Sequence, residues 1–201
     1  MMPSFVLLIA YLLGAIPFGF LLVKWKTGED VRSSGSGNIG ATNVLRTTGR
    51  AAGIVTLLLD IAKGYAAVWI AALLTGSSPL WMSLAALAVM AGHAFPVFLK
   101  FRGGKAVASF IGAFLYLAPL PLLAVLGVFV VVVAATRYIS LGSILACGTF
   151  PVAVWLISHP PSAVVWAAAI AGLFVIVRHH ANIARLAKGC EHKFSFGSKK
   201  S

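Results

Sequence analysis

Apolar runs about as long as a membrane-spanning helix recur along this chain and limit what it can fold into. A helix that crosses a bilayer needs about twenty apolar residues. Candidate runs lie at 5–24, 51–75, 79–99, 105–119, 120–136, 140–158 and 162–178. Only 10% of the residues are charged and 60% are hydrophobic, which is unlike a soluble domain. The sequence therefore predicts an all-α polytopic membrane protein with seven transmembrane helices, folded as a single domain over residues 1–201.

The basic residues predict how this bundle is oriented. All sixteen Lys and Arg residues except Lys63 fall in the turns after the first, third, fifth and seventh runs, or in the C-terminal tail. By the positive-inside rule these turns face the cytoplasm, so the N-terminus is outside and the C-terminus inside. Pro119 and Pro121 offer an alternative, one kinked helix in place of the fourth and fifth runs. That alternative would move Arg137 and all later basic residues to the other side.

Charge and cysteine content exclude several classes of function. The net charge of +12 would suit nucleic acid, but no recognition helix or basic–aromatic ribbon is visible, so we predict no nucleic-acid partner. Cys147 lies in an apolar run and Cys190 in the basic tail, which predicts neither a disulfide nor a metal site. The N-terminus lacks the basic region of a cleavable signal peptide, so the first run should remain as a span.

Residues 32–46 form the longest polar interruption and have the composition of an anion-binding loop. Glycines at 35, 37 and 40 would let consecutive backbone N–H groups converge on a ligand, and Arg32 and Arg46 would add charge-assisted hydrogen bonds. The same glycines match a dinucleotide-binding fingerprint, but no strand precedes them, so we reject that interpretation. A flexible connector is the alternative, although it would not need asparagines and arginines. The stretch predicts a phosphate site.

Three further polar segments, at 92–105, 137–143 and 178–186, fall on the same predicted face, and we expect all four to converge on one site. Lys105 is the strongest single candidate for an anion-binding residue. Gly103 and Gly104 before it would offer free N–H groups, and a helix begins after it, so ammonium and helix N-terminus would face one anion. Leu99 and Ala106 depart from the nucleotide-binding P-loop pattern, which excludes nucleotide hydrolysis.

Titratable residues within the apolar runs suggest structure more than catalysis. Asp60 and Lys63 are three residues apart on one predicted helix and can pair, either to fix packing or within the active site. His93 has no partner in the sequence and fits a structural role. No histidine is followed five residues later by aspartate, so the sequence predicts no histidine–aspartate general base.

With these segments together, the sequence resembles the bacterial membrane acyl-phosphate:glycerol-3-phosphate acyltransferase family. The resemblance rests on residues 35–43, on 92–96 with 103–105, and on Asn182 with the tail at 189–191, and it extends over the whole chain. Arg102 and Ala106 depart mildly, since relatives often have lysine and glycine there. The resemblance implies transfer of an acyl group from acyl phosphate to the 1-hydroxyl of glycerol 3-phosphate. The products would be lysophosphatidic acid and phosphate, in the first step of phospholipid synthesis at the bacterial inner membrane.

The resemblance also implies which residues form the site, with no metal and no cofactor. The expected acyl-phosphate-binding residues are Ser36, Gly37, Asn38, Gly40, Ala41, Gly104 and Lys105. The expected glycerol-3-phosphate-binding residues are Arg46, Lys105, Ser143, His179 and Asn182. Among them Ser36, Lys105, Ser143 and Asn182 are the expected catalytic residues.

The chemistry of the residues agrees with such a reaction. Two phosphorylated substrates need a positive surface, and an acyl chain buried in a bundle contributes about 0.8 kcal/mol per methylene. Because acyl phosphate is already activated, we predict direct attack by the glycerol hydroxyl without an acyl-enzyme.

The competing class of protein is a transporter of phosphorylated metabolites, which should show internal repeats that seven spans do not supply. A scaffold protein would leave the glycine-rich loops unexplained. The sequence leaves the oligomeric state open, a monomer included.

Overall fold

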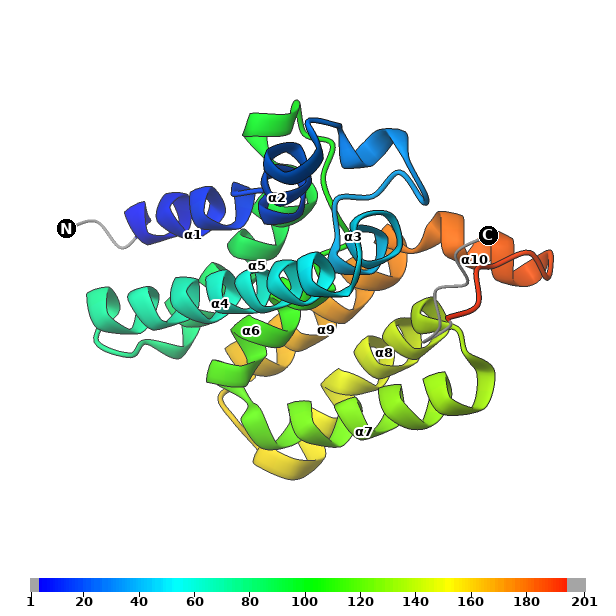
Figure 1. Cartoon of the computed structure of the whole chain (residues 1–201). Coiled ribbons are helices and arrows are strands. Elements are labelled where there is room, and N and C mark those ends of the chain that lie inside the picture. Colours follow the sequence, from blue (N-terminus) through cyan, green and yellow to red (C-terminus); the bar gives the residue numbers. More distant parts are fainter. Residues whose placement is uncertain (1–3, 195–201) are drawn as a thin grey trace. The chain divides into compact units, whose positions relative to one another are not determined.

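The structure is a computed structural model that describes residues 4–194 (Figure 1). Within that range all regular secondary structure is helical, without strands, as predicted. The helices are α1 (Phe5–Ala15), α2 (Phe18–Thr27), η1 (Val31–Ser33), α3 (Ala41–Thr48), α4 (Arg50–Thr75), α5 (Pro79–Ala94), η2 (Val97–Leu99), α6 (Val107–Leu117), α7 (Pro119–Thr136), α8 (Ile139–Ser158), α9 (Ser162–Arg178) and α10 (His180–Ala187). They fall into two compact units, Met1–Leu117 and Ala118–Ser201, which are described separately.

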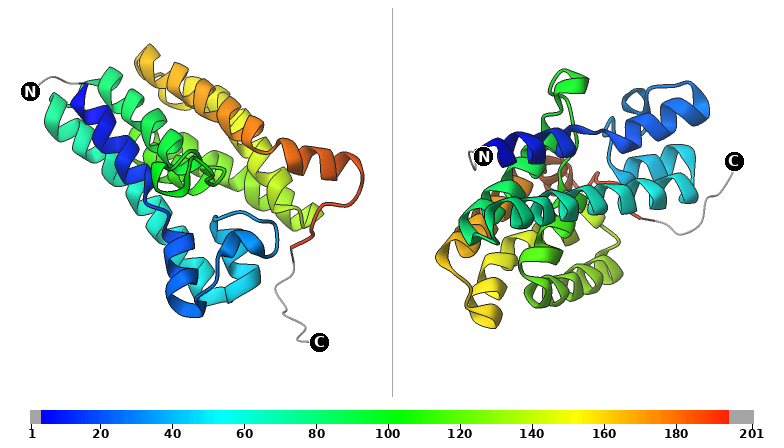
Figure 2. Two further views of the ribbon diagram at one scale, coloured as in Figure 1. Left: turned by 90° about the horizontal axis from the view of Figure 1, so that it is seen from above. Right: turned by 90° about the vertical axis from the view of Figure 1, so that its left-hand side faces the viewer.

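Unit 1 is built from helices that pack through small side chains. Helix α1 runs beside α5, and α4 packs against α6 (Figure 2). One buried cluster consists only of alanine and valine: Val6, Ala10, Ala67, Val68, Ala71, Ala85, Ala86, Val89 and Ala113. A Cβ atom added at Gly64 would collide with the backbone oxygen of Ser109, and one at Gly112 with that of Ile61. Helices α4 and α6 therefore approach to backbone contact, a form of packing that membrane helices favour.

Unit 2 continues with α7, α8 and α9, each packed against the next. Helix α7 starts at Pro119 and α6 ends at Leu117, so the fourth and fifth predicted runs are two helices and not one kinked helix. Proline suits the first helical turn, where its missing N–H would lack an intrahelical acceptor in any case. Helices α9 and α10 meet at an angle of 57°. This bend places His179 between them.

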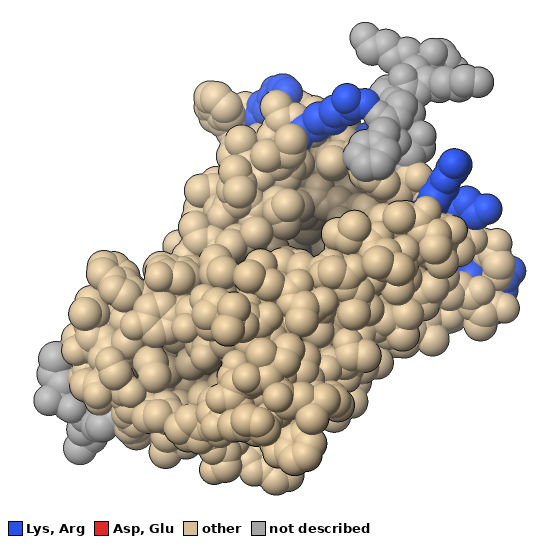
Figure 3. Space-filling view, turned by 90° about the horizontal axis from the view of Figure 1, so that it is seen from below, with Lys and Arg blue, Asp and Glu red and all other residues tan. Residues whose placement is uncertain are grey.

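Five helical segments of residues 4–194 are long and apolar enough to cross a bilayer: Phe5–Thr27, Arg50–Thr75, Pro79–Leu99, Pro119–Thr136 and Ile139–Ser158. A sixth is added if α9 and α10 count as one bent span. Helix α6 has 11 residues, about 16 Å, which is shorter than the roughly 30 Å of a bilayer core. On the face shown in Figure 3 almost all of the described surface is uncharged. The chain is thus a multi-pass membrane protein, whereas seven spans stay a prediction.

Candidate active site

Asn43 organises the predicted phosphate loop. Its side chain is buried, at 2% exposure, and reaches back from α3 into the preceding loop. The amide Nδ2 donates to the carbonyl oxygens of Val31 (3.2 Å), Ser34 (3.1 Å) and Asn38 (2.8 Å). Its Oδ1 accepts the N–H of Ser36 at 2.8 Å. One side chain thereby sets the path of the loop, a role that the sequence analysis missed although Asn43 lies inside the recognised motif.

The loop uses several of the donors that were expected to face a ligand. The N–H of Gly37 donates to the carbonyl of Ser34 at 3.1 Å, and that of Gly40 to Oδ1 of Asn38 at 2.8 Å. Gly35 and Gly37 have φ values of +62° and +69°, which glycine adopts without strain. The expected run of converging N–H groups is therefore wrong for Ser36, Gly37 and Gly40, because local acceptors compete for them.

Two donors remain at the start of α3. The first N–H groups of a helix have no intrahelical acceptor, and here the first helical bonds are made by Asn43 and Val44 to the carbonyl of Gly40. The N–H groups of Ala41 and Thr42 are thus oriented out of the helix end, where the helix dipole favours an anion. Ser36 is exposed beside this loop, and Asn38 and Ala41 are half-buried.

Arg32 does not serve the loop as expected. Its Nε and Nη2 atoms form an ion pair with the carboxylate of Asp30, with a shortest distance of 2.6 Å, and its guanidinium lies over the ring of Phe20. The hydrogen bond from Arg32 holds the pKa of Asp30 below its ordinary value. The prediction that Arg32 supplies charge to the ligand is therefore wrong, because a nearby carboxylate competes for it. Arg46 lies exposed in α3.

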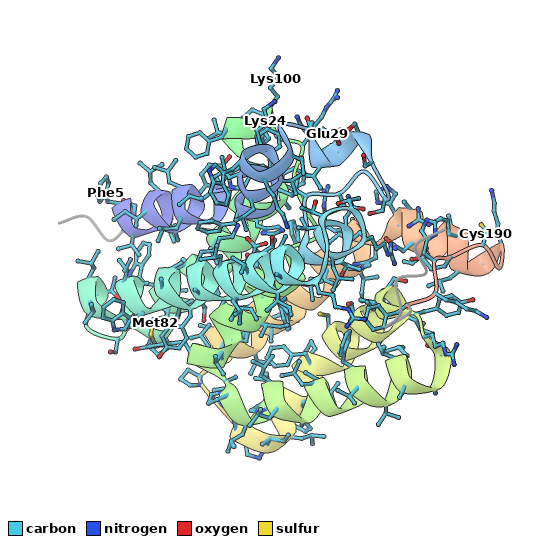
Figure 4. All side chains as sticks on the ribbon, in the orientation of Figure 1. Phe5, Lys24, Glu29, Met82, Lys100 and Cys190 are labelled. Atoms are coloured by element: carbon cyan, nitrogen blue, oxygen red, sulfur yellow. The ribbon has the colours of Figure 1, made fainter. Side chains whose placement is uncertain are left out.

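The turn that carries Lys105 is tied to the end of α5. The N–H of Gly103 donates to the carbonyl of Ala94, and that of Gly104 to the carbonyl of His93, both at 3.1 Å. The predicted free N–H groups of these glycines are thus wrong, because the turn closes back on α5. Lys105 itself is half-buried and directly precedes Ala106, whose φ is +62°. Lys100 is one of the basic residues that predict the orientation of the bundle, it is not among the predicted site residues, and it points away from the ribbon (Figure 4).

A buried ionic cluster lies beneath this turn. Lys63 Nζ is 2.8 Å from Oδ1 of Asp60, so the predicted pair within one helix is confirmed. Nδ1 of His93 lies 3.7 Å from the same oxygen and 3.2 Å from Oγ of Ser109. The sequence showed no partner for His93, and the structure places the carboxylate of Asp60 next to it; that no histidine–aspartate pair acts as a general base stays a prediction. Asp60 and His93 are far apart in sequence and meet only because α4 and α5 pack together, so no local spacing reveals them.

Ser143, His179 and Asn182 belong to unit 2 and are all buried, at 4%, 3% and 5% exposure. Nδ1 of His179 is 2.8 Å from the carbonyl oxygen of Val175. The second ring nitrogen, Nε2, takes no part in this contact. The hydroxyl of Ser143 donates to the carbonyl of Ile139 at 2.9 Å. Oδ1 of Asn182 is buried without a hydrogen-bond partner among the described residues. A buried amide oxygen in this state is costly unless a ligand donates to it.

Glu191 holds Asn182 in place and was not among the predicted site residues. Its Oε1 accepts hydrogen bonds from Asn182 Nδ2 (2.7 Å) and Ser140 Oγ (3.0 Å), and its Oε2 pairs with Arg185 Nε at 2.7 Å. Burial alone would raise the pKa of Glu191, but these hydrogen bonds outweigh it and hold the pKa below its ordinary value. The sequence did hold a signal for this role. Glu191 ends the segment at 189–191 that carries part of the family resemblance, and it is the one carboxylate in an otherwise basic tail.

Unit 1 thus contains the loop at 34–41, Arg46 and Lys105, and unit 2 contains Ser143, His179 and Asn182. That these two groups form one site stays a prediction. Lys199 and Lys200, assigned to orientation, lie outside the described residues.

Comparison with known proteins identifies the relatives of this chain. Residues 4–189 match the family model described as glycerol-3-phosphate acyltransferase. Proteins with that name from Trichlorobacter lovleyi and Geobacter sulfurreducens are 50% and 47% identical, each over 92% of this chain and 94% of the relative. The fold is similar to a crystal structure of PlsY (YgiH), an integral membrane glycerol 3-phosphate acyltransferase, in its glycerol 3-phosphate form. The TM-score is 0.90 at 37% identity, covering 97% of this chain and 96% of the other. A lysophosphatidic acid form of PlsY matches with a TM-score of 0.88.

Proposed function

The chain belongs to the glycerol-3-phosphate acyltransferase family, and we propose that it transfers a fatty acyl group from acyl phosphate to the 1-hydroxyl of glycerol 3-phosphate. The match over residues 4–189 carries the proposal, because it includes every predicted site residue. It also favours an enzyme over the transporter that the basic residues alone would allow. The products would be lysophosphatidic acid and inorganic phosphate.

Unit 1 supplies the groups that would hold the acyl phosphate. Ser36, Gly37, Asn38, Gly40 and Ala41 form the loop, and Gly104 and Lys105 form the second turn. The N-terminus of α3 supports this assignment, since the N–H groups of Ala41 and Thr42 and the helix dipole would stabilise phosphate charge. Lys105 would add a full positive charge to the leaving phosphate.

Glycerol 3-phosphate would be held by Arg46, Lys105, Ser143, His179 and Asn182. The unpartnered Oδ1 of Asn182 supports a ligand hydroxyl as its missing donor. His179 and Arg46 can donate to phosphate oxygens. Residues from both units would then be needed for activity, which is what a single functional domain over 1–201 requires.

The proposed step is one displacement at the acyl carbonyl. The 1-hydroxyl oxygen of glycerol 3-phosphate forms the new ester bond, and the bond between the carbonyl carbon and the phosphate oxygen breaks. The electron pair leaves with phosphate, and the hydroxyl proton passes to a phosphate oxygen. Charge and atoms balance without a protein base or a cofactor.

The surroundings of the serines support direct transfer. Ser143 donates to a backbone carbonyl of its own helix, which does not activate an oxygen as a nucleophile. Ser140 donates to Glu191, but a carboxylate with a lowered pKa is a weak base. Ser36 is exposed in the loop. An acyl-enzyme would need a stronger base at one of these hydroxyls.

We further propose seven spans in the bacterial inner membrane, with the N-terminus outside and the site at the cytoplasmic face. The short helix α6 would be the fourth span, completed by the turn at 103–106 before it. The one-sided placement of the basic residues supports this orientation.

The function is tested with the purified full-length protein in detergent or lipid. Acyl phosphate and glycerol 3-phosphate together should release phosphate and form lysophosphatidic acid in equal amounts, and neither substrate alone should do so. Product formation from an acyl thioester at the same rate would contradict the proposed donor.

The mechanism is tested with acyl phosphate labelled in its acyl chain, added without glycerol 3-phosphate and quenched by rapid denaturation. Direct transfer predicts no protein-bound label. A stoichiometric, hydroxylamine-sensitive adduct that disappears on addition of glycerol 3-phosphate would establish an acyl-enzyme instead, and its loss in Ser36→Ala or Ser143→Ala would identify the nucleophile.

A further inference from the structure

The buried cluster of Asp60, Lys63, His93 and Ser109 has no part in the proposed reaction. It joins three helices of unit 1, because Asp60 and Lys63 come from α4, His93 from α5 and Ser109 from α6. All four residues are at most 4% exposed. Lys63 Nζ also donates to the carbonyl of Ile16 at 2.8 Å, at the break between α1 and α2.

Such a cluster is a poor device for stability. Ionised groups are expensive inside a membrane protein, and a buried pair often contributes no more than an apolar replacement of similar size. Oδ1 of Asp60 has two ionic neighbours but no well-aligned hydrogen-bond donor. Asp60 is also one of only four acidic residues in the chain. Its cost suggests that it does something that an apolar side chain cannot do.

His93 connects this cluster to the turn that carries Lys105. On the backbone side, its carbonyl accepts the N–H of Gly104 at 3.1 Å. On the side-chain side, its ring lies against Gly104 so closely that a Cβ atom there would collide with Nε2. Beyond the turn, Ser109 of α6 returns to Nδ1 of the same ring at 3.2 Å. Lys105 therefore lies between two segments that are both attached to His93.

We propose that His93, oriented by Asp60 and Ser109, is a positioning residue that fixes the turn at 103–105 and thereby the ammonium group of Lys105. The ring forms the floor of the turn, and its rotation is set on the Nδ1 side by Ser109 and the carboxylate. Lys63 balances the charge of Asp60. This inference rests on the proposed role of Lys105 at the phosphate.

The experiment separates charge balance from positioning. Asp60→Asn alone would leave Lys63 buried as an unpaired charge, so the informative variant is Asp60→Asn combined with Lys63→Met. It removes both charges at similar volume and leaves His93 without its carboxylate. Folded protein is measured by monodispersity and thermal unfolding. The matched control is Ser83→Ala, a buried polar residue of α5 outside the cluster, which should keep normal kinetics.

We expect the neutral pair variant to fold and to lose about tenfold or more in kcat, with a raised KM for acyl phosphate, as for a displaced catalytic group. The same pair of changes on a Lys105→Met background should cause no further loss, because the cluster acts through Lys105. Loss of folded protein alone would not produce this non-additivity.

Normal kinetics of the neutral pair variant, or an equal loss with and without Lys105, would overturn the inference. If that variant does not fold, Ser109→Ala takes its place in the same comparison, with a smaller loss expected and normal kinetics again contradicting it. The proposed role of Lys105 is tested separately: if Lys105→Met alone retained normal turnover, the proposal for Lys105 would fail before any variant of the cluster is compared.

Discussion

Replacing Asn43 by alanine should disable the phosphate loop although Asn43 itself is not one of the residues assigned to substrate. The change removes four hydrogen bonds, one to each of Val31, Ser34, Ser36 and Asn38. A net hydrogen bond contributes about 1 kcal/mol, and the partly exposed partners regain some of this from water, so the ordered loop should lose about 3 kcal/mol. At about 1.4 kcal/mol per factor of ten, kcat/KM should fall about a hundredfold.

The assay is the initial rate of lysophosphatidic acid formation, with each variant normalised to folded protein. Thr47→Val is the matched control, because it removes a hydroxyl that bonds to the carbonyl of Asn43 within the same helix. Asn43→Asp keeps the acceptor for Ser36 but points a carboxylate at three carbonyl oxygens, so its loss should be at least as large. A folded Asn43→Ala enzyme within about threefold of the parent kcat/KM would refute this account of the loop.

Three further outcomes follow from the structure. Lys105→Met should lose about a hundredfold or more in turnover, as for removal of a charge-stabilising group, whereas Lys100→Met should remain near normal in the same phosphate-release assay. Because the folded pKa of Glu191 is lowered, its stabilising contacts are present at neutral pH and lost as the pH falls through that pKa. The difference in Tm between the parent and Glu191→Gln should therefore be largest near neutrality and vanish on acidification; a difference that grows in acid would contradict it. A single cysteine at Ser78 in a Cys-free background should react with an impermeant maleimide in intact cells and one at Ser34 should not, and the opposite pattern would reverse the orientation.

The helical architecture could be predicted from the sequence because hydrophobicity and proline act locally. The apolar runs became helices, and Pro119 opened a new helix as its chemistry favours. The pairing of Asp60 with Lys63 was also predictable, since residues three apart on one helix share a face. The length of α6 was not, because the apolar run at 105–119 includes Lys105 and Ala106, whereas α6 begins at Val107 after a turn that is tied to the end of α5.

Composition predicted the phosphate loop and the family resemblance predicted the individual site residues, but neither predicted the hydrogen-bond partners of these residues. Glycine content predicts where N–H groups can converge, yet it does not show that Asn43 and the end of α5 already accept those N–H groups. The contact of His93 with Asp60 depends on how two helices cross, which no spacing in the sequence encodes. Residue types and spacing therefore predicted which segments are polar or helical. They did not predict which acceptors the N–H groups and charged side chains of those segments bind.

The loop around Asn43 is held in shape by four hydrogen bonds within the chain. A preorganised loop loses little conformational entropy on binding, so any ligand with a phosphate group of suitable geometry can bind to it. If the loop binds the phosphate group of acyl phosphate as proposed, it should also bind the inorganic phosphate that the reaction releases. Product inhibition by phosphate, competitive with acyl phosphate, would then be built into the enzyme. A higher phosphate concentration in the cell would then lower the rate of lysophosphatidic acid formation.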